Sequence, residues 1–163
     1  MAIEKVKAYF AEKGMAERIL EFDVSSATVE LAAKALGCEP AHIAKTLGFV
    51  DGEGCLLVVA AGDAKVDNRR FRDEFGMKAK MLPFDQVEAL IGHAVGGVCP
   101  FAVNPGVPVY LDESLKRFEI VYPAAGSSNS TVRLTLSELE QFSGAVKWVN
   151  VCKIGRASCR ERV

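Results

Sequence analysis

Apolar residues recur with helical spacing at the start of the chain. Ile3, Val6 and Phe10 fall on one face of a predicted helix over residues 3–13, which Gly14 ends. The positions between them are mostly charged or small. The pattern is typical of an amphipathic helix that packs one face on a core.

A second helix is predicted over residues 29–36, after the pair Ser25-Ser26 and before Gly37. Its apolar positions have the spacing i, i+3, i+4, i+7, and they are Val29, Ala32, Ala33 and Leu36. Because two of these four side chains are single methyl groups, we expect this helix to pack closely on a sheet.

Two strands follow. Residues 43–50 alternate in a way that favours a strand, residues 51–54 form a turn, and residues 55–60 are a continuous apolar run typical of a buried strand. Asp67 is a good N-cap for a third helix, and Pro83 opens a fourth helix through Val87, Leu90 and Ile91. Further strands are predicted over 78–81, 107–111, 117–122, 131–136 and 146–151. Ser137 and Glu140 have the spacing of a capping box for a last short helix.

Helices and strands therefore mix irregularly along the chain, and no repeat or linker divides it. We expect one α+β domain with a mixed sheet over residues 1–153, and not a regular doubly wound fold. A chain of 163 residues is long enough to bury a sizeable core.

Composition narrows the function classes. Half of the residues are hydrophobic and a quarter are charged, as in soluble globular proteins. No apolar run could span a bilayer, and the first residues lack the order of a signal peptide, so a cytoplasmic protein without a membrane partner is expected. Five scattered cysteines without a Cys-x-x-Cys pair, and only two histidines, argue against a metal site.

The last ten residues, 154–163, have no apolar period and match one reading frame of a common sequencing-adaptor DNA. We interpret them as a non-native artefact, although a genuine basic tail is the alternative. Without this tail, which holds three Arg and one Glu, the chain has 17 basic and 20 acidic residues, a net charge of −3. Such a body is not a general nucleic-acid binder, so no DNA partner is expected and any RNA contact should be local.

The segment 92–106 is the most informative stretch. It holds four of the 14 glycines and two of the six prolines among apolar residues. Backbone N–H groups at Gly96 and Gly97 could approach a ligand closely or form an oxyanion hole, whereas the alternative is a tight turn between strands. Cys99 could be a nucleophile, but no His or Asp adjacent in sequence would activate it, so a small buried thiol is favoured.

Lys45 interrupts an apolar strand face. In a strand, Ile43, Lys45, Leu47 and Phe49 point to the same side. The lysine either snorkels at the rim or sits in a pocket, where its ammonium would suit a phosphate, a carboxylate or a polarised carbonyl.

Three further features are less specific. Residues 124–131 form a hydroxyl-rich turn that a plain hairpin loop would also explain. His42 and His93 are poorly placed for a catalytic triad, and a structural or surface role is favoured for His93. A cluster of cations is mostly a solvated face but is the best local patch for an RNA backbone; it comprises Lys65, Arg69, Arg70, Arg72, Lys78 and Lys80.

The order of these segments resembles the YbaK/prolyl-tRNA synthetase-associated editing domain family over nearly all of residues 1–153. The resemblance rests on the strand Ile43-Ala44-Lys45-Thr46-Leu47, the loop Gly96-Gly97-Val98-Cys99-Pro100-Phe101 and the turn Ala125-Gly126-Ser127-Ser128-Asn129. It implies a compact domain with a mixed, barrel-like sheet flanked by helices. It also implies hydrolysis of the ester that joins a wrong amino acid to the terminal adenosine of tRNA, with no cofactor and no metal.

The resemblance also assigns roles to residues. It implies that Lys45 engages the terminal nucleotide and the aminoacyl ester, while the ribose hydroxyl of the tRNA helps to position or activate water. The implied substrate-binding residues are Thr46, Gly96, Gly97, Val98, Cys99, Pro100, Gly126, Ser127, Ser128 and Asn129. Cys99 stands where the Cys-specific branch of the family has serine.

The leading hypothesis from the sequence is a trans-editing aminoacyl-tRNA deacylase of the tRNA(Pro) type. Its expected partners are the acceptor end of mischarged tRNA and, given the acidic body, an aminoacyl-tRNA synthetase. One alternative is a non-catalytic module of the same fold that binds an amino acid or the aminoacyl end. Another is a small-molecule esterase that uses Cys99.

Overall fold

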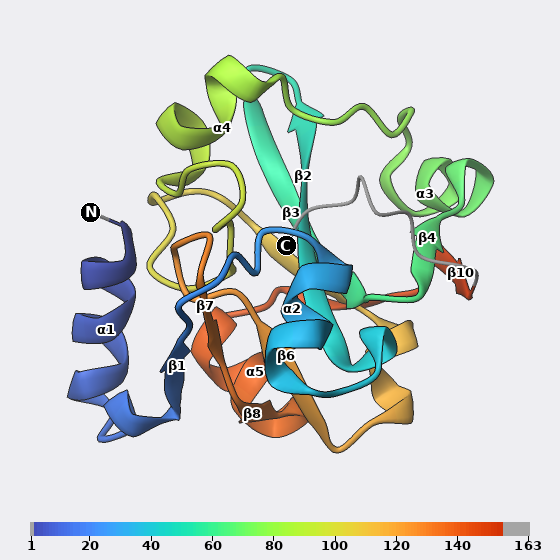
Figure 1. The fold of residues 1–163 in the computed structure, drawn as a ribbon. Helices are drawn as coiled ribbons and strands as arrows, with labels where there is room; N and C mark the ends of the chain where they lie inside the picture. Colours follow the sequence, from blue (N-terminus) through green and yellow to red (C-terminus); the bar gives the residue numbers. More distant parts are fainter. Residues whose placement is uncertain (1, 155–163) are drawn as a thin grey trace.

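Strands β2 (Ile43–Asp51) and β3 (Gly54–Ala61) form the centre of the computed structural model, which describes residues 2–154 (Figure 1). They pair antiparallel along their whole length, from Ala44 opposite Ala61 to Asp51 opposite Gly54. All residues of β3 after Gly54 are buried. This agrees with the apolar run seen in the sequence, since a strand covered on both faces needs no polar alternation.

These two strands belong to a six-stranded mixed sheet with the order β8-β6-β2-β3-β5-β9. The other members are β5 (Val109–Asp112), β6 (Ile120–Pro123), β8 (Leu134–Thr135) and β9 (Lys147–Val149). The β2–β6, β3–β5 and β5–β9 pairs are parallel, and the β6–β8 pair is antiparallel. Two small antiparallel sheets flank it, made of β1 (Ile19–Glu21) with β7 (Ser130–Val132) and of β4 (Ala64–Val66) with β10 (Cys152–Ile154).

Five α-helices of the described residues surround the sheet (Figure 1). They are α1 (Ala2–Glu12), α2 (Val29–Leu36), α3 (Asn68–Phe75), α4 (Phe84–Ile91) and α5 (Leu136–Ser143). Short 3-10 turns occur at Ala16–Arg18, Pro40–His42 and Glu113–Arg117. The architecture is the expected single α+β domain with a curled mixed sheet and flanking helices.

Local signals in the sequence mark the helix ends well. Asp67 caps α3 by accepting hydrogen bonds from the backbone nitrogens of Arg69 and Arg70. Gly37 ends α2 in the left-handed conformation, with φ of 72°. Helix α4 begins directly after Pro83, as predicted.

Three element predictions are wrong in detail. Residues 78–81 form no strand but a single bridge from Met81 to Phe49, because α4 begins only three residues later, at Phe84. The predicted strand 131–136 divides at Arg133 into β7 and β8, which pair with different strands, and its last residue begins α5. The capping box of α5 is formed by Thr135 and Glu138, not by Ser137 and Glu140.

Two strand boundaries also shift. Residues 113–117 form a 3-10 turn, so the strand predicted over 117–122 begins only at Ile120. The strand predicted over 146–151 covers Lys147–Val149, and Val151 instead donates its backbone N–H to buried Asp112. Of the predicted tail 154–163, Ile154 ends β10 opposite Ala64, and residues 155–163 lie outside the described residues.

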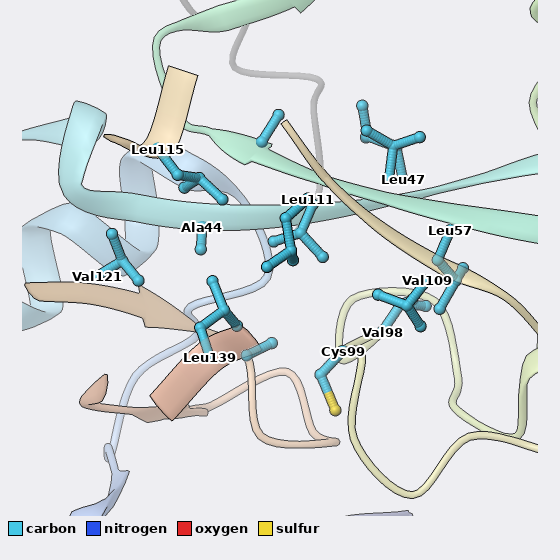
Figure 2. Packing of buried hydrophobic residues seen from close by; sticks show 14 of the residues in the cluster. Ala44, Leu47, Leu57, Val98, Cys99, Val109, Leu111, Leu115, Val121 and Leu139 are labelled. Atoms are coloured by element: carbon cyan, nitrogen blue, oxygen red, sulfur yellow. The ribbon is translucent and has the colours of Figure 1, made fainter. Parts of the chain in front are cut away.

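The core lies on both faces of β2 and β3. Figure 2 shows Leu47 and Ala44 on opposite sides of β2, with Val121 and Leu139 on the side of Ala44. Val98 lies close to Leu57 and Val109, so the glycine loop is packed against the sheet. Within residues 2–154, no helix is both long and apolar enough to cross a bilayer.

Candidate active site

One edge of β2 changes partner along its length. Strand β6 pairs with β2 only at Ile43 and Ala44, where the ladder ends opposite Pro123. Further on, the segment before α4 takes over, since Leu82 donates to Gly48 and Val50 donates to Lys80. In the described ladders, residues 45–47 are paired only on their β3 side. The candidate site lies at this opening.

Lys45 sits where β6 leaves β2. Its side chain is completely buried, and it is among the largest fully buried side chains of the described residues. The structure therefore decides against snorkelling at the rim, one of the two alternatives that the sequence left open. A buried ammonium that must be matched by polar groups is a feature common at functional sites.

Thr46 is buried beside it, with 4% of its surface exposed. Its Oγ1 atom finds no hydrogen-bond partner within the described part of the chain. Successive strand residues direct their backbone polar groups to alternate edges, so the Thr46 N–H and C=O face the same edge as those of Gly48 and Val50. The two backbone polar groups of Thr46 thus face the opening, and its side chain lines the cavity there.

A cavity of about 540 Å³ occupies this opening. Its walls come from β2, β4, the start of α3, the segment before α4, α4 itself and the glycine loop. They are formed by Thr46, Leu47, Gly48, Phe49, Lys65, Val66, Asn68, Ala79, Met81, Leu82, Phe84, Val87, Ile91, Val95, Gly96 and Val98. The cavity is mostly apolar with a few polar groups, as ligand sites commonly are.

The glycine loop 96–100 is buried throughout. Gly96 and Val98 face the cavity, and Gly96 has a φ of 97° that favours glycine. Gly97 instead packs against the following turn, because a Cβ atom there would lie 2.6 Å from the backbone nitrogen of Ser127. The two glycines thus have different roles, which their adjacency in sequence does not reveal.

The turn 126–129 is held by its own polar groups. Ser127 Oγ lies 2.9 Å from Asn129 Oδ1 and 2.6 Å from Ser130 Oγ. The Ser128 carbonyl accepts from the Ser26 backbone nitrogen at 2.6 Å, and Asn129 exchanges hydrogen bonds with the Phe22 backbone. These contacts support the interpretation of these side chains as loop-stabilising groups.

The structure thus joins two of the three predicted segments directly. The loop of Gly96 and Gly97 contacts the turn of Ser127 and Ser128. Of the predicted residues, those that line the cavity are Thr46, Gly96 and Val98; those that do not are Lys45, Gly97, Cys99, Pro100, Gly126, Ser127, Ser128 and Asn129. Sequence reasoning missed the α4 wall, because its apolar spacing is the same for core and cavity-lining residues.

Cys99 has a histidine neighbour that its sequence context did not indicate. His93 Nε2 lies 3.5 Å from Cys99 Sγ and 2.7 Å from the Phe101 carbonyl oxygen. The shorter contact is best explained by Nε2–H donating to that carbonyl, which leaves Nε2 unable to take the thiol proton. Burial also raises the pKa of the Cys99 thiol to about 12, and burial lowers the pKa of His93. Both side chains thus contact the Phe101 carbonyl oxygen at the end of the glycine loop, which favours a structural role for the pair.

Within residues 2–154, no group of three or more His, Cys, Asp or Glu side chains could hold a metal ion. The walls of the cavity that belong to the described residues also include no carboxylate and no imidazole. The polar side chains that these walls offer are the Thr46 hydroxyl, the Asn68 amide and the Lys65 ammonium. The Gly97 N–H, which the sequence suggested for an oxyanion hole, instead donates to the Ala94 carbonyl oxygen at 3.0 Å.

Comparisons with known proteins agree with this arrangement. A family model described as an aminoacyl-tRNA editing domain matches residues 23–142. The uncharacterized protein YwhH of Bacillus subtilis (strain 168) is 47% identical over 154 residues, which are 94% of this chain and 98% of YwhH.

Two solved structures share the fold. One is described as a candidate trans-editing enzyme for prolyl tRNA synthetase; it is 29% identical, with a TM-score of 0.83 over 93% of this chain and 97% of that chain. The other is the hypothetical protein APE2540, also 29% identical, with a TM-score of 0.81 over 91% of this chain and 99% of that chain.

Proposed function

This chain belongs to the aminoacyl-tRNA editing domain family, and on that premise we propose that it is a deacylase that hydrolyses the ester of mischarged tRNA in trans. The observation that carries the proposal is the buried Lys45 at the opening of β2, beside a cavity that Thr46 and Gly96 share. Lys45 lies on the central strand β2, which also forms one wall of the cavity, so the sheet fixes the position of the cation.

The reaction adds water to the carbonyl carbon of the aminoacyl ester. The bond from that carbon to the ribose oxygen breaks, and the products are a free amino acid and a tRNA with its terminal hydroxyl restored. Negative charge develops on the carbonyl oxygen, where the Lys45 ammonium and the backbone N–H of Gly96 would stabilise it. The walls supply position and charge, and they leave room for the ester to be held in one orientation.

Water activation is assigned to the substrate. The described walls of the cavity offer no carboxylate or imidazole as a general base. In our proposal the neighbouring ribose hydroxyl of the tRNA orients the water, and the Thr46 hydroxyl helps to hold that ribose. The unpartnered state of Thr46 Oγ1 within the described residues supports this role.

The tRNA(Pro) type is the proposed substrate class. The support is the described association of one structural neighbour with prolyl tRNA synthetase. The acidic body of the chain implies weak intrinsic affinity for tRNA, so we propose that a synthetase delivers the substrate. Action on charged tRNA places the protein in the cytoplasm under this proposal.

The test is hydrolysis of a panel of mischarged tRNAs by the chain without residues 155–163. We expect release of the amino acid from at least one mischarged tRNA(Pro). Lys45→Met, which keeps the unbranched side chain but removes the charge, should lower the rate on the order of 100-fold or more. Lys34→Ala, which removes an exposed lysine from α2, is the matched control and should act like the parent.

Two results would contradict the proposal. A Lys45→Met protein that melts normally and retains full activity would remove its central residue. Binding of aminoacyl-tRNA without turnover would favour the alternative of a non-catalytic binding module. An esterase that uses Cys99 is disfavoured, because this thiol is fully buried and its pKa is about 12.

A further inference from the structure

Phe84 is an exposed aromatic residue at the rim of the cavity. It has 65% of its surface exposed, and Met81, three residues earlier, has 54%. Among the described large hydrophobic residues that are exposed, Phe84 is the only aromatic one, and these two are the only ones that line the cavity. An exposed aromatic ring at the mouth of a mostly apolar cavity offers a flat apolar surface to a molecule bound there.

The rim is continuous with the proposed reaction site. Phe84 and Met81 share one cavity with Thr46 and Gly96. The segment that carries Met81 is tied to β2 by hydrogen bonds on both sides, from Val50 to Lys80 and from Leu82 to Gly48. The position of the rim relative to Thr46 is therefore fixed by the sheet.

Positive charge lies on the same rim. Lys65 is exposed and is the only charged residue among the described cavity walls. Lys78 and Lys80 are exposed on the segment that carries Met81. The acids Asp85 and Glu88 are also exposed on α4, but neither lines the cavity. A phosphate that follows an occupant into the cavity would therefore meet a cation first.

We propose that Phe84, together with Met81, is a stacking platform for a nucleobase of the single-stranded 3′ end of tRNA, with Lys65 facing its phosphate. This inference rests on the proposed function, and it identifies the side chains that would hold the acceptor end. Aromatic faces beside cations are the usual way in which proteins hold single-stranded nucleic acid without reading its sequence. Two side chains are too small for a protein interface, which buries roughly 800 Å² on each partner, whereas they match one base.

The cavity size is consistent with this occupant. A volume of about 540 Å³ exceeds what an amino-acid side chain alone requires, and it leaves space for the attached nucleoside. The buried end at Thr46 would then hold the ester, and the exposed end at Phe84 would hold a base.

The experiment measures binding of the RNA tetranucleotide ACCA, which carries no amino acid, to the full chain by NMR titration at low salt. Matched probes lack one base at a time. We expect loss of one base to weaken binding to the parent about fivefold to 100-fold. Phe84→Ala should weaken binding of intact ACCA by a similar factor. This variant should also bind intact ACCA no more tightly than it binds the probe whose missing base weakened binding to the parent.

Three further variants complete the design. Phe84→Trp should retain binding because it keeps an aromatic face, and Val146→Ala, at an exposed valine outside the cavity, should behave like the parent. Lys65→Ala should reduce the dependence of binding on salt, by about one in the slope of the double-logarithmic plot. Phe84 is an exposed first residue of α4, so its variants should fold normally.

Equal binding of intact and abasic probes by the parent would overturn the platform, and so would unchanged binding by Phe84→Ala. Loss of a protein partner, but not of RNA, on replacement of Phe84 would also overturn it. Failure of the proposed function is a separate result, because it appears as a parent protein that binds RNA but hydrolyses no mischarged tRNA.

Discussion

Gly97 packs so closely on Ser127 that a Cβ atom at residue 97 would lie 2.6 Å from the Ser127 backbone nitrogen. The contact joins the glycine loop to the hydroxyl-rich turn, two segments about 30 residues apart in sequence. Real Cβ atoms essentially never approach backbone so closely, so one of the two segments would have to move.

Gly97→Ala is therefore expected to displace the loop from the turn. We predict a loss of about 1–3 kcal/mol in the free energy of unfolding and a marked fall in deacylation. Gly54→Ala is the control, because the nearest atom to a Cβ at that position is 3.8 Å away. Chemical denaturation and a single-turnover assay measure the two effects. If Gly97→Ala were as stable as the parent, residue 97 would lie farther from the Ser127 backbone than the structure shows.

Thr46→Val should separate stability from activity. The replacement keeps the shape of the side chain and removes an Oγ1 atom that is buried without a partner among the described residues. We expect the free energy of unfolding to stay the same or to rise by about 1 kcal/mol, because an unsatisfied hydroxyl is lost. Activity should fall about tenfold, since the hydroxyl is proposed to hold the substrate. A variant that is stable and fully active would show that this hydroxyl does not touch the substrate.

The buried His93 predicts a pH dependence of stability. Desolvation lowers its pKa below the ordinary value of 6.5, so the unfolded chain binds a proton more readily than the folded one. The contribution of His93 to the free energy of unfolding is therefore fully present above about pH 6.5. It is lost as the pH falls from there toward the lowered pKa. Denaturant midpoints measured between pH 5 and pH 8 should show this slope.

His93→Gln should flatten that slope, whereas His42→Gln, at a partly exposed histidine, should leave it in place. The His93 variant also loses the hydrogen bond to the Phe101 carbonyl. If both variants kept the parent slope, other groups would be responsible for the acid sensitivity.

Cys99 should be inert to thiol reagents in the folded protein. It is fully buried and its pKa is raised to about 12, so almost no thiolate exists at neutral pH. Among the four cysteines within residues 2–154, Cys38 is partly exposed and should react first. Mass spectrometry after brief alkylation locates the label, and deacylation should survive it. Rapid loss of activity with a label on Cys99 would revive a catalytic role for this thiol.

Much of the local structure follows from the sequence, because it depends on neighbouring residues. The apolar run of β3, the N-cap Asp67, Pro83 before α4 and the left-handed Gly37 are all local signals, and each specifies its element. Short or irregular strands are different. The strand predicted over 131–136 divides because β7 and β8 find partners on β1 and β6, and neither partner is visible in the pattern of that segment.

The candidate site divides in the same way. The sequence by itself determined its chemistry, with Lys45 on an apolar strand and a glycine loop and a hydroxyl-rich turn in a given order. Only the tertiary structure decided that Lys45 is buried, that Gly97 meets Ser127, and that Phe84 stands at the rim of the cavity. Each of these depends on where distant segments meet across the sheet, and the physical reason is that side-chain spacing encodes which face is apolar but not which segment covers it.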